Sequence, residues 1–179
     1  MNSLIDTLST LTPDGRRLTE AILETSRKNF EADGHLVPVA FSLPLGGENV
    51  AVFTIDRFDD ETKPMVWGQI RILRETHPIV LFLSEVWTVE AGKDKLLDFI
   101  NPDGTCKVMP RNHPDRKECV LLQLWEGRRA VTFKADITRK PTVLGEWEVF
   151  FDSAFTTGHK ATDVTGAMME GGHYPLANS

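Results

Sequence analysis

Residues 79–89 form a β-rich run that opens with five apolar side chains in succession, Ile-Val-Leu-Phe-Leu. A strand with one face in water alternates apolar and polar residues, whereas a continuous apolar run needs cover on both faces. We therefore place this segment at the centre of a sheet, with other elements packed above and below it.

Three later segments also have strand character, at residues 117–125, 128–137 and 144–151. A tight turn at Glu126-Gly127 joins the first two and predicts an antiparallel hairpin. The third alternates apolar and acidic residues, so we expect it to bury one face and expose the other. Its inward residues are Trp147, Val149 and Phe151, and its outward residues are Glu146 and Glu148.

The first third of the chain predicts two helices. Apolar residues recur at helical spacing before Thr12 and again after it, as far as Ala32. Thr12 is a favourable N-cap, Pro13 fits the first helical position, and Gly34 provides a left-handed stop.

The next segment predicts a hairpin and a third helix. Residues 36–43 and 49–55 alternate as two strands, and Pro38 cannot donate to a ladder, so its strand should lie at the sheet edge or carry a bulge. An acidic first turn, Asp59-Asp60-Glu61, then opens a helix that ends at His77-Pro78. The apolar face of this helix consists of Val66, Trp67, Ile70 and Leu73.

The resulting order is α-α-β-β-α-β-β-β-β, in which local hairpin connections dominate. This order predicts an α+β fold with a mainly antiparallel sheet of about six strands, rather than a doubly wound parallel sheet. We expect one domain at residues 1–152 and an appended tail at 153–179 that orders against a partner. The long connection 91–116 is expected to hold a short helix at 93–100, or else to be functional or mobile.

Charge and composition narrow the function classes. Acidic residues outnumber Lys and Arg by 26 to 20, giving a net charge of -6, which opposes binding to nucleic acid. The chain has no run of about 18 apolar residues to span a bilayer, and its first residues lack the basic start of a secretory signal, so we expect a cytoplasmic protein. Cys106 and Cys119 belong to no CxxC pair and are expected to be reduced thiols. Signatures of serine hydrolases, nucleotide-binding loops and HExxH metalloproteases are missing from the sequence.

One stretch, His113-Pro114-Asp115-Arg116-Lys117-Glu118, combines an imidazole with carboxylates at short spacing. If strands 79–89 and 117–125 pair antiparallel, Glu85 approaches Glu118 and the loop of His113. Such groups can hold a divalent metal or act as acids and bases. The candidate catalytic residues are Glu85, Asp115, Arg116 and Glu118, and the candidate metal ligand is His113.

A structural interpretation of the same residues stands beside the catalytic one. His-Pro-Asp commonly starts a turn, and Arg116 is then a clamp that pairs with Glu85 or Glu118. The four tryptophans are expected in the core, although Trp87 and Trp125 would form an interaction surface if one sheet face were uncovered.

Three segments of the chain resemble a set of small bacterial proteins to which no activity is attached. They are residues 33–41, Ser84-Glu85-Val86-Trp87 and the stretch from His113 to Glu118, within the middle half of the chain. The resemblance groups Glu85, Arg116 and Glu118 together and implies no activity.

Two functional hypotheses follow from these observations. The first is a non-catalytic interaction or accessory module that binds a protein partner or associates with itself. The alternative is a divalent-metal-assisted hydrolase that uses His113, Asp115, Glu118 and Glu85.

Overall fold

The computed structural model describes residues 3–45, 48–59, 61–89, 107–108 and 110–155 of the 179-residue chain. The helices in these residues are α1 (Leu4–Ser9), α2 (Pro13–Asp33) and α3 (Lys63–Thr76), with short 3-10 helices η2 (Pro110–Asn112) and η3 (Ser153–Phe155). The strands are β1 (Val39–Leu43), β2 (Ala51–Thr54), β3 (Ile79–Thr88), β4 (Lys117–Glu126), β5 (Arg129–Arg139), β6 (Thr142–Leu144) and β7 (Glu148–Asp152).

All strand pairs are antiparallel, and the sheet has the order β2-β1-β3-β4-β5-β6, with β7 also paired to β5. The α+β class and the predicted order of elements are therefore confirmed. β3 lies inside the sheet between β1 and β4, and its first six residues are buried, as the apolar run predicts. The β3–β4 register sets Trp87 opposite Glu118, which brings together the strand ends that carry the candidate site.

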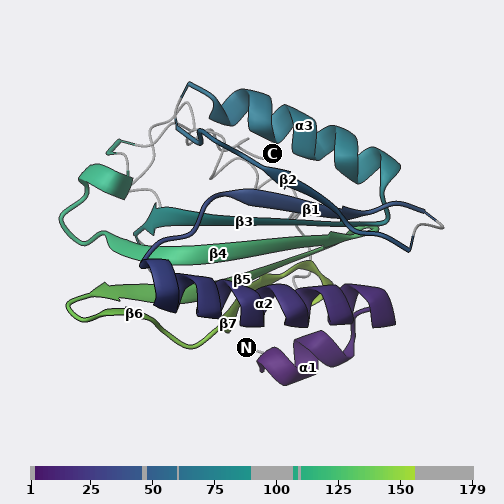
Figure 1. Ribbon diagram of the computed structural model, residues 1–179, viewed down its shortest axis with the longest axis horizontal. Helices are drawn as coiled ribbons and strands as arrows, with labels where there is room; N and C mark the ends of the chain where they lie inside the picture. The colour runs from purple at the N-terminus through teal and green to yellow at the C-terminus, as the bar shows by residue number, and fades with distance from the viewer. Residues whose placement is uncertain (1–2, 46–47, 60, 90–106, 109, 156–179) are drawn as a thin grey trace, which may run out of the picture.

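The helices cover the two sides of the sheet, and Figure 1 shows α2 and α3 on either side of the strands. Leu81, Leu122 and Phe133 lie on what we call the α2 face and pack into one cluster with Phe30 of α2. Residues of the opposite parity lie on the α3 face, where Trp67 packs edge-on against Phe82 and Trp125. Trp147 is also buried, whereas Trp87 is 42% exposed.

Local signals place both ends of α2 where the sequence predicts them. Thr12 Oγ1 accepts a hydrogen bond from the Gly15 N–H at 3.2 Å, which satisfies one of the free amides of the first turn. Gly34 closes the helix with φ 73°, a left-handed conformation that glycine adopts without Cβ strain.

The prediction that the Pro38 strand lies at the edge is wrong, because β1 pairs with both β2 and β3. Pro38 itself stands just before β1, and its carbonyl accepts from the Ile55 N–H at 2.9 Å. Pro38 therefore stands where the β1–β2 ladder ends, and an interior strand tolerates a residue without an N–H at that position. β2 is the terminal strand of this sheet among the described residues.

The segment predicted as one strand at 144–151 is divided into β6 and β7. Gly145 stands at the break, where its N–H donates to the Asp136 carbonyl at 2.8 Å and an added Cβ would lie 3.1 Å from the same oxygen. A register shift between Thr132 and Phe133 then turns Phe151 toward the α3 face, while Val149 packs on the α2 face as predicted.

Three smaller features differ from the sequence prediction or fall outside the described part of the chain. The β4–β5 turn consists of Gly127 and Arg128, with φ 56° at Gly127. The acidic stretch lies before α3 rather than in its first turn, and the Asp59 carboxylate accepts from the N–H groups of Glu61 and Thr62. The predicted helix at 93–100 and most of the predicted tail, residues 156–179, lie outside the described residues.

Candidate functional site

Glu85 and Glu118 do approach each other, and both bind Arg139 at the end of β5. We call these three residues the strand-end cluster. The Arg139 guanidinium donates from Nε to Glu118 Oε2 at 2.8 Å and from a terminal nitrogen to the other Glu118 oxygen, and it reaches Glu85 Oε2 at 3.3 Å. The carboxylates are mostly covered, with Glu85 20% and Glu118 16% exposed.

The strand-end cluster also joins the sheet to the end of α2. Arg139 donates to the Gly34 carbonyl at 2.6 Å and lies over the Phe30 ring at 5.6 Å, and Glu85 Oε1 accepts from the Leu36 N–H at 2.7 Å. Hydrogen bonding to Glu118 raises the pKa of Arg139 above its ordinary value, against the lowering effect of desolvation. The guanidinium is therefore a permanent cation that neutralises the carboxylates and holds four segments together.

The remaining candidate residues, His113, Asp115 and Arg116, lie in the segment just before β4 and do not contact the carboxylates of Glu85 and Glu118. His113 Nδ1 accepts from the Asp115 N–H at 3.1 Å, and the His113 carbonyl accepts from the Arg116 N–H at 3.2 Å, so the segment forms a hydrogen-bonded turn. The clamp interpretation predicted that Arg116 pairs with Glu85 or Glu118, and this prediction is wrong. Its guanidinium carbon lies 5.2 Å from the centre of the exposed Trp87 ring.

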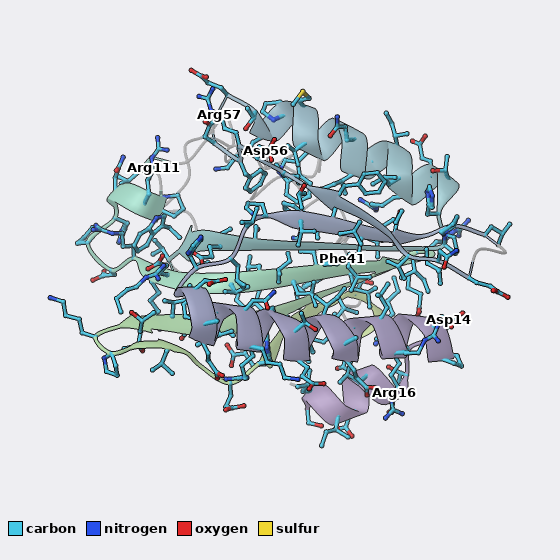
Figure 2. All side chains as sticks on the ribbon, viewed as in Figure 1. Asp14, Arg16, Phe41, Asp56, Arg57 and Arg111 are labelled. Carbon is cyan, nitrogen blue, oxygen red and sulfur yellow. The ribbon has the colours of Figure 1, made fainter. Side chains whose placement is uncertain are left out.

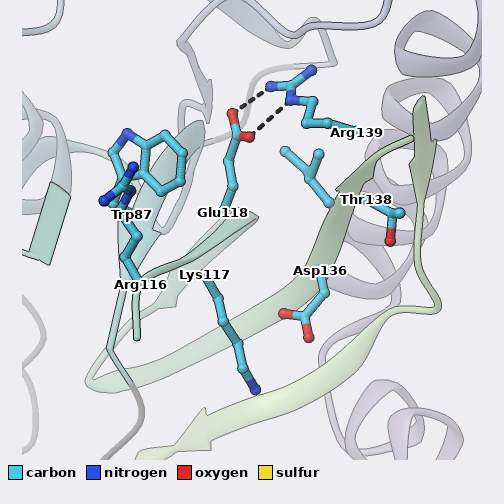
Figure 3. A pocket seen from close by; sticks show the side chains of 8 residues that line it. Trp87, Arg116, Lys117, Glu118, Asp136, Thr138 and Arg139 are labelled. Atoms are coloured by element: carbon cyan, nitrogen blue, oxygen red, sulfur yellow. Dashed lines mark hydrogen bonds and ion pairs between the residues drawn. The ribbon is translucent and has the colours of Figure 1, made fainter. Parts of the chain in front are cut away.

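A cavity of about 390 Å³ opens between β4 and β5 beside the strand-end cluster. The β4–β5 pairing ends at Cys119 and Asp136. Beyond these residues β4 remains paired with β3, and β5 pairs with β6 instead. Figure 3 shows Trp87 and Arg116 on one side of this opening and Asp136 and Thr138 on the other, with the Arg139–Glu118 pair across it. The opening is a consequence of strand divergence.

The chemistry available at the strand-end cluster is limited by these contacts. Within the described residues, no group of three or more His, Cys, Asp or Glu side chains is placed to hold a metal ion. Each carboxylate already has a guanidinium partner, and the imidazole faces a backbone amide. The arrangement fits a structural clamp better than an acid–base pair.

A second feature, which the sequence interpretation missed, is an apolar groove between α2 and the β1–β2 hairpin; we call it the α2–β2 groove. Its volume is about 520 Å³. The α2 wall includes Leu18, Ala21, Thr25 and Asn29, and the floor includes Val39, Phe41, Val52 and Leu83. Figure 2 shows Phe41 on the strands between α2 and α3. Among the strands, α2 lies against β4 and β6, and Val39 and Phe41 of β1 are only partly buried in the cluster on this face.

The groove extends across β3 and β1 to one face of β2, and the outer edge of β2 lies beyond it. The bond from Ile55 N–H to the Pro38 carbonyl identifies 38 and 55 as a hydrogen-bonded pair, and such pairs alternate along an antiparallel ladder. The backbone groups of Phe53 therefore point toward β1, whereas those of Val52 and Thr54 point away from it. The side chains of Val52, which is 56% exposed, and Thr54 line the groove.

Acidic residues stand at the ends of α2 and β2, and only the one at the end of α2 lines the groove. Asp33, the last residue of α2, lines the groove, and Asp56 follows β2 by two residues. Neither side chain forms an ion pair with any residue the structure describes. The nearby Arg57 is already bound to Asp59 and to Glu61, the latter at 2.7 Å.

No protein-family model matches the chain, and searches of curated proteins and of solved structures likewise found no match. Within the described residues, no helix is both long and apolar enough to cross a membrane.

Proposed function

We propose that the protein is a non-catalytic interaction module that binds another polypeptide as an added strand on β2. The observation that carries the proposal is that β2, beyond which the described residues place no further strand, also contributes side chains to the apolar α2–β2 groove. Strand addition uses such a pair of features, since backbone hydrogen bonds supply affinity and alternate side chains enter adjoining pockets.

The β2 edge has the chemistry that strand addition requires. Val52 and Thr54 each offer one outward N–H and one outward carbonyl. Natural sheet edges are commonly protected by charge, proline or a covering element. The sequence of β2, Ala-Val-Phe-Thr, contains neither a charged residue nor a proline, and its residues Val52, Phe53 and Thr54 are exposed.

The hydrolase alternative receives less support from the same structure. It requires His113, Asp115, Glu118 and Glu85 to converge, whereas Arg139 binds both glutamates and His113 bonds within its own turn. We retain the cytoplasm as the proposed location, with which the buried Cys119, which forms no disulfide within the described residues, is compatible.

The proposal is tested by adding an uncharged strand peptide, acetyl-TTVTVTV-amide, to ¹⁵N-labelled protein. We expect the Val52 and Thr54 amides to become protected from exchange. Val52→Pro should abolish binding, because proline removes an outward N–H without removing a bond to β1. Val52→Thr keeps that N–H and is the matched control. Binding that is unaffected by Val52→Pro, or no binding to the wild type, would overturn the assignment.

A further inference from the structure

We infer that the segment added at β2 is the β2 strand of a second copy of this chain, paired antiparallel about a two-fold axis at Phe53. The inference rests on the proposed function and names the partner. Three observations carry it. Apolar side chains are exposed on both faces of β2, its outward backbone groups lie on two residues that can face each other across the axis, and one register keeps like charges apart.

Both faces of β2 present apolar side chains to solvent. Val52, which is 56% exposed, lines the groove on the α2 face, whereas Phe53, which is 44% exposed, lies opposite Ala40 on the α3 face. An uncharged edge of this kind is a template for pairing with another copy of itself. A two-fold contact is closed, because each copy covers the edge of the other and no third copy can add there.

Backbone geometry limits the registers available to this pairing. The outward N–H and carbonyl groups of β2 belong to Val52 and Thr54. A two-fold ladder that uses these groups can be centred on Val52, on Phe53 or on Thr54. Centring on Thr54 pairs residues beyond the end of β2, so the first two registers remain.

Charge and packing favour the ladder centred on Phe53. Centring on Val52 brings Glu48 toward the partner's Asp56, so like charges meet twice in the dimer. Centring on Phe53 moves Asp56 toward the partner's Val50 instead. The two Phe53 side chains then face each other in a non-hydrogen-bonded pair, in which facing side chains are closest and an aromatic pair is favourable.

The second copy also extends the α2–β2 groove. In the ladder centred on Phe53, Val52 faces the partner's Thr54 in a hydrogen-bonded pair, and facing side chains lie on the same face of the sheet. Val52 and Thr54 both line the groove, so the grooves of the two copies meet at the axis. They form one apolar floor between two α2 helices, and each copy contributes half of it.

Sedimentation velocity of the full chain tests the pairing. We expect a reversible dimer that strengthens with added salt, because each copy carries a net charge of -6 and screening weakens the repulsion. Val52→Pro removes two of the four hydrogen bonds across the axis and should raise the dissociation constant at least about tenfold. Val52→Thr keeps the N–H, is the matched control, and should retain the dimer.

Cysteine substitutions test the register. Under mild oxidation, Phe53→Cys should give a dimer linked by a 53–53 disulfide, because facing Cα atoms of a non-hydrogen-bonded pair lie about 4.5 Å apart, within the range of a disulfide. Val52→Cys should not link to itself, since it faces the partner's Thr54. Peptide mapping by mass spectrometry distinguishes these links from those of the native Cys106 and Cys119. Linkage at 52–52 without linkage at 53–53 would refute the ladder centred on Phe53.

The outcomes separate this inference from the proposed function. A wild type that stays monomeric up to about 1 mM, with peptide binding that Val52→Pro abolishes, would overturn the second-copy inference and leave strand addition intact. A dimer that Val52→Pro does not weaken would show that the copies meet elsewhere and would also overturn the inference. If peptide binding survived Val52→Pro as well, strand addition would be refuted too.

Discussion

Replacing Arg139 by methionine tests whether the strand-end cluster is a structural clamp. The substitution keeps much of the apolar stem but removes the guanidinium from Glu118, Glu85 and the Gly34 carbonyl. Two carboxylates that are 16% and 20% exposed then lack their cation.

The expected cost lies between two limits. An exposed ion pair contributes about 0–1 kcal/mol, whereas breaking a buried pair costs about 3–5 kcal/mol. Arg139 is 41% exposed, so solvent screens part of the interaction, while both carboxylates are mostly covered. We therefore expect the free energy of unfolding to fall by about 2–3 kcal/mol.

Urea unfolding monitored by tryptophan fluorescence measures this change, with an unchanged denaturant slope as the sign that the native fold is retained. The exposed pair of Arg16 and Glu20 provides the control, and Arg16→Met should cost less than about 0.5 kcal/mol. In a double-mutant cycle, Arg139→Met and Glu118→Gln should show a coupling of about 1 kcal/mol or more. If Arg139→Met cost no more than Arg16→Met, the clamp interpretation would be refuted.

Three further predictions concern the C-terminal end of α2, a buried ion pair and pH. Gly34→Ala should destabilise the protein by about 1–2 kcal/mol, because a Cβ is strained at φ 73°, whereas Gly68→Ala inside α3 should stabilise it. Thermal unfolding measures both changes, and a lower melting temperature for both variants would contradict the prediction. Asp152→Asn removes the negative charge that pairs with the mostly buried guanidinium of Arg129 on β5. The free energy of unfolding measured in urea should fall by about 3 kcal/mol, and a fall typical of an exposed ion pair would count against the role of this pair. The hydrogen bond from Lys28 lowers the pKa of Glu24, so its contribution is present above the unfolded-state pKa and is lost as pH falls through the folded-state pKa. Lys28→Met should move the Glu24 titration seen by NMR to higher pH, and an unmoved midpoint would contradict the assignment.

Short-range signals predicted most of the fold. Thr12 and Gly34 act on backbone groups within a few residues, and the apolar run of β3 demands cover on both faces wherever it is placed. The pairing of β3 with β4, and with it the meeting of Glu85 and Glu118, was also accessible, because local hairpin connections leave few alternatives.

The partner of the two glutamates was not accessible in the same way. Arg139 lies 21 residues from Glu118 and 54 from Glu85, and the predicted strand ended before it, at residue 137. One signal was present: Val131, Phe133, Ala135 and Ile137 alternate toward the α2 face, and Arg139 continues that parity. An arginine at the end of an apolar face suggests a buried acidic partner, but spacing alone does not say which one.

The sequence by itself therefore determined the three helices, most of the strands, the α+β class and the central place of β3, since these depend on periodicity and on caps that act over one turn of chain. Only the tertiary structure decided that β1 is interior, that Arg139 neutralises the strand-end cluster, and that an apolar groove forms between α2 and the β1–β2 hairpin. The physical reason is that strand order and helix cover are set by how faces distant in the chain share a limited buried area, and local sequence patterns do not record that division.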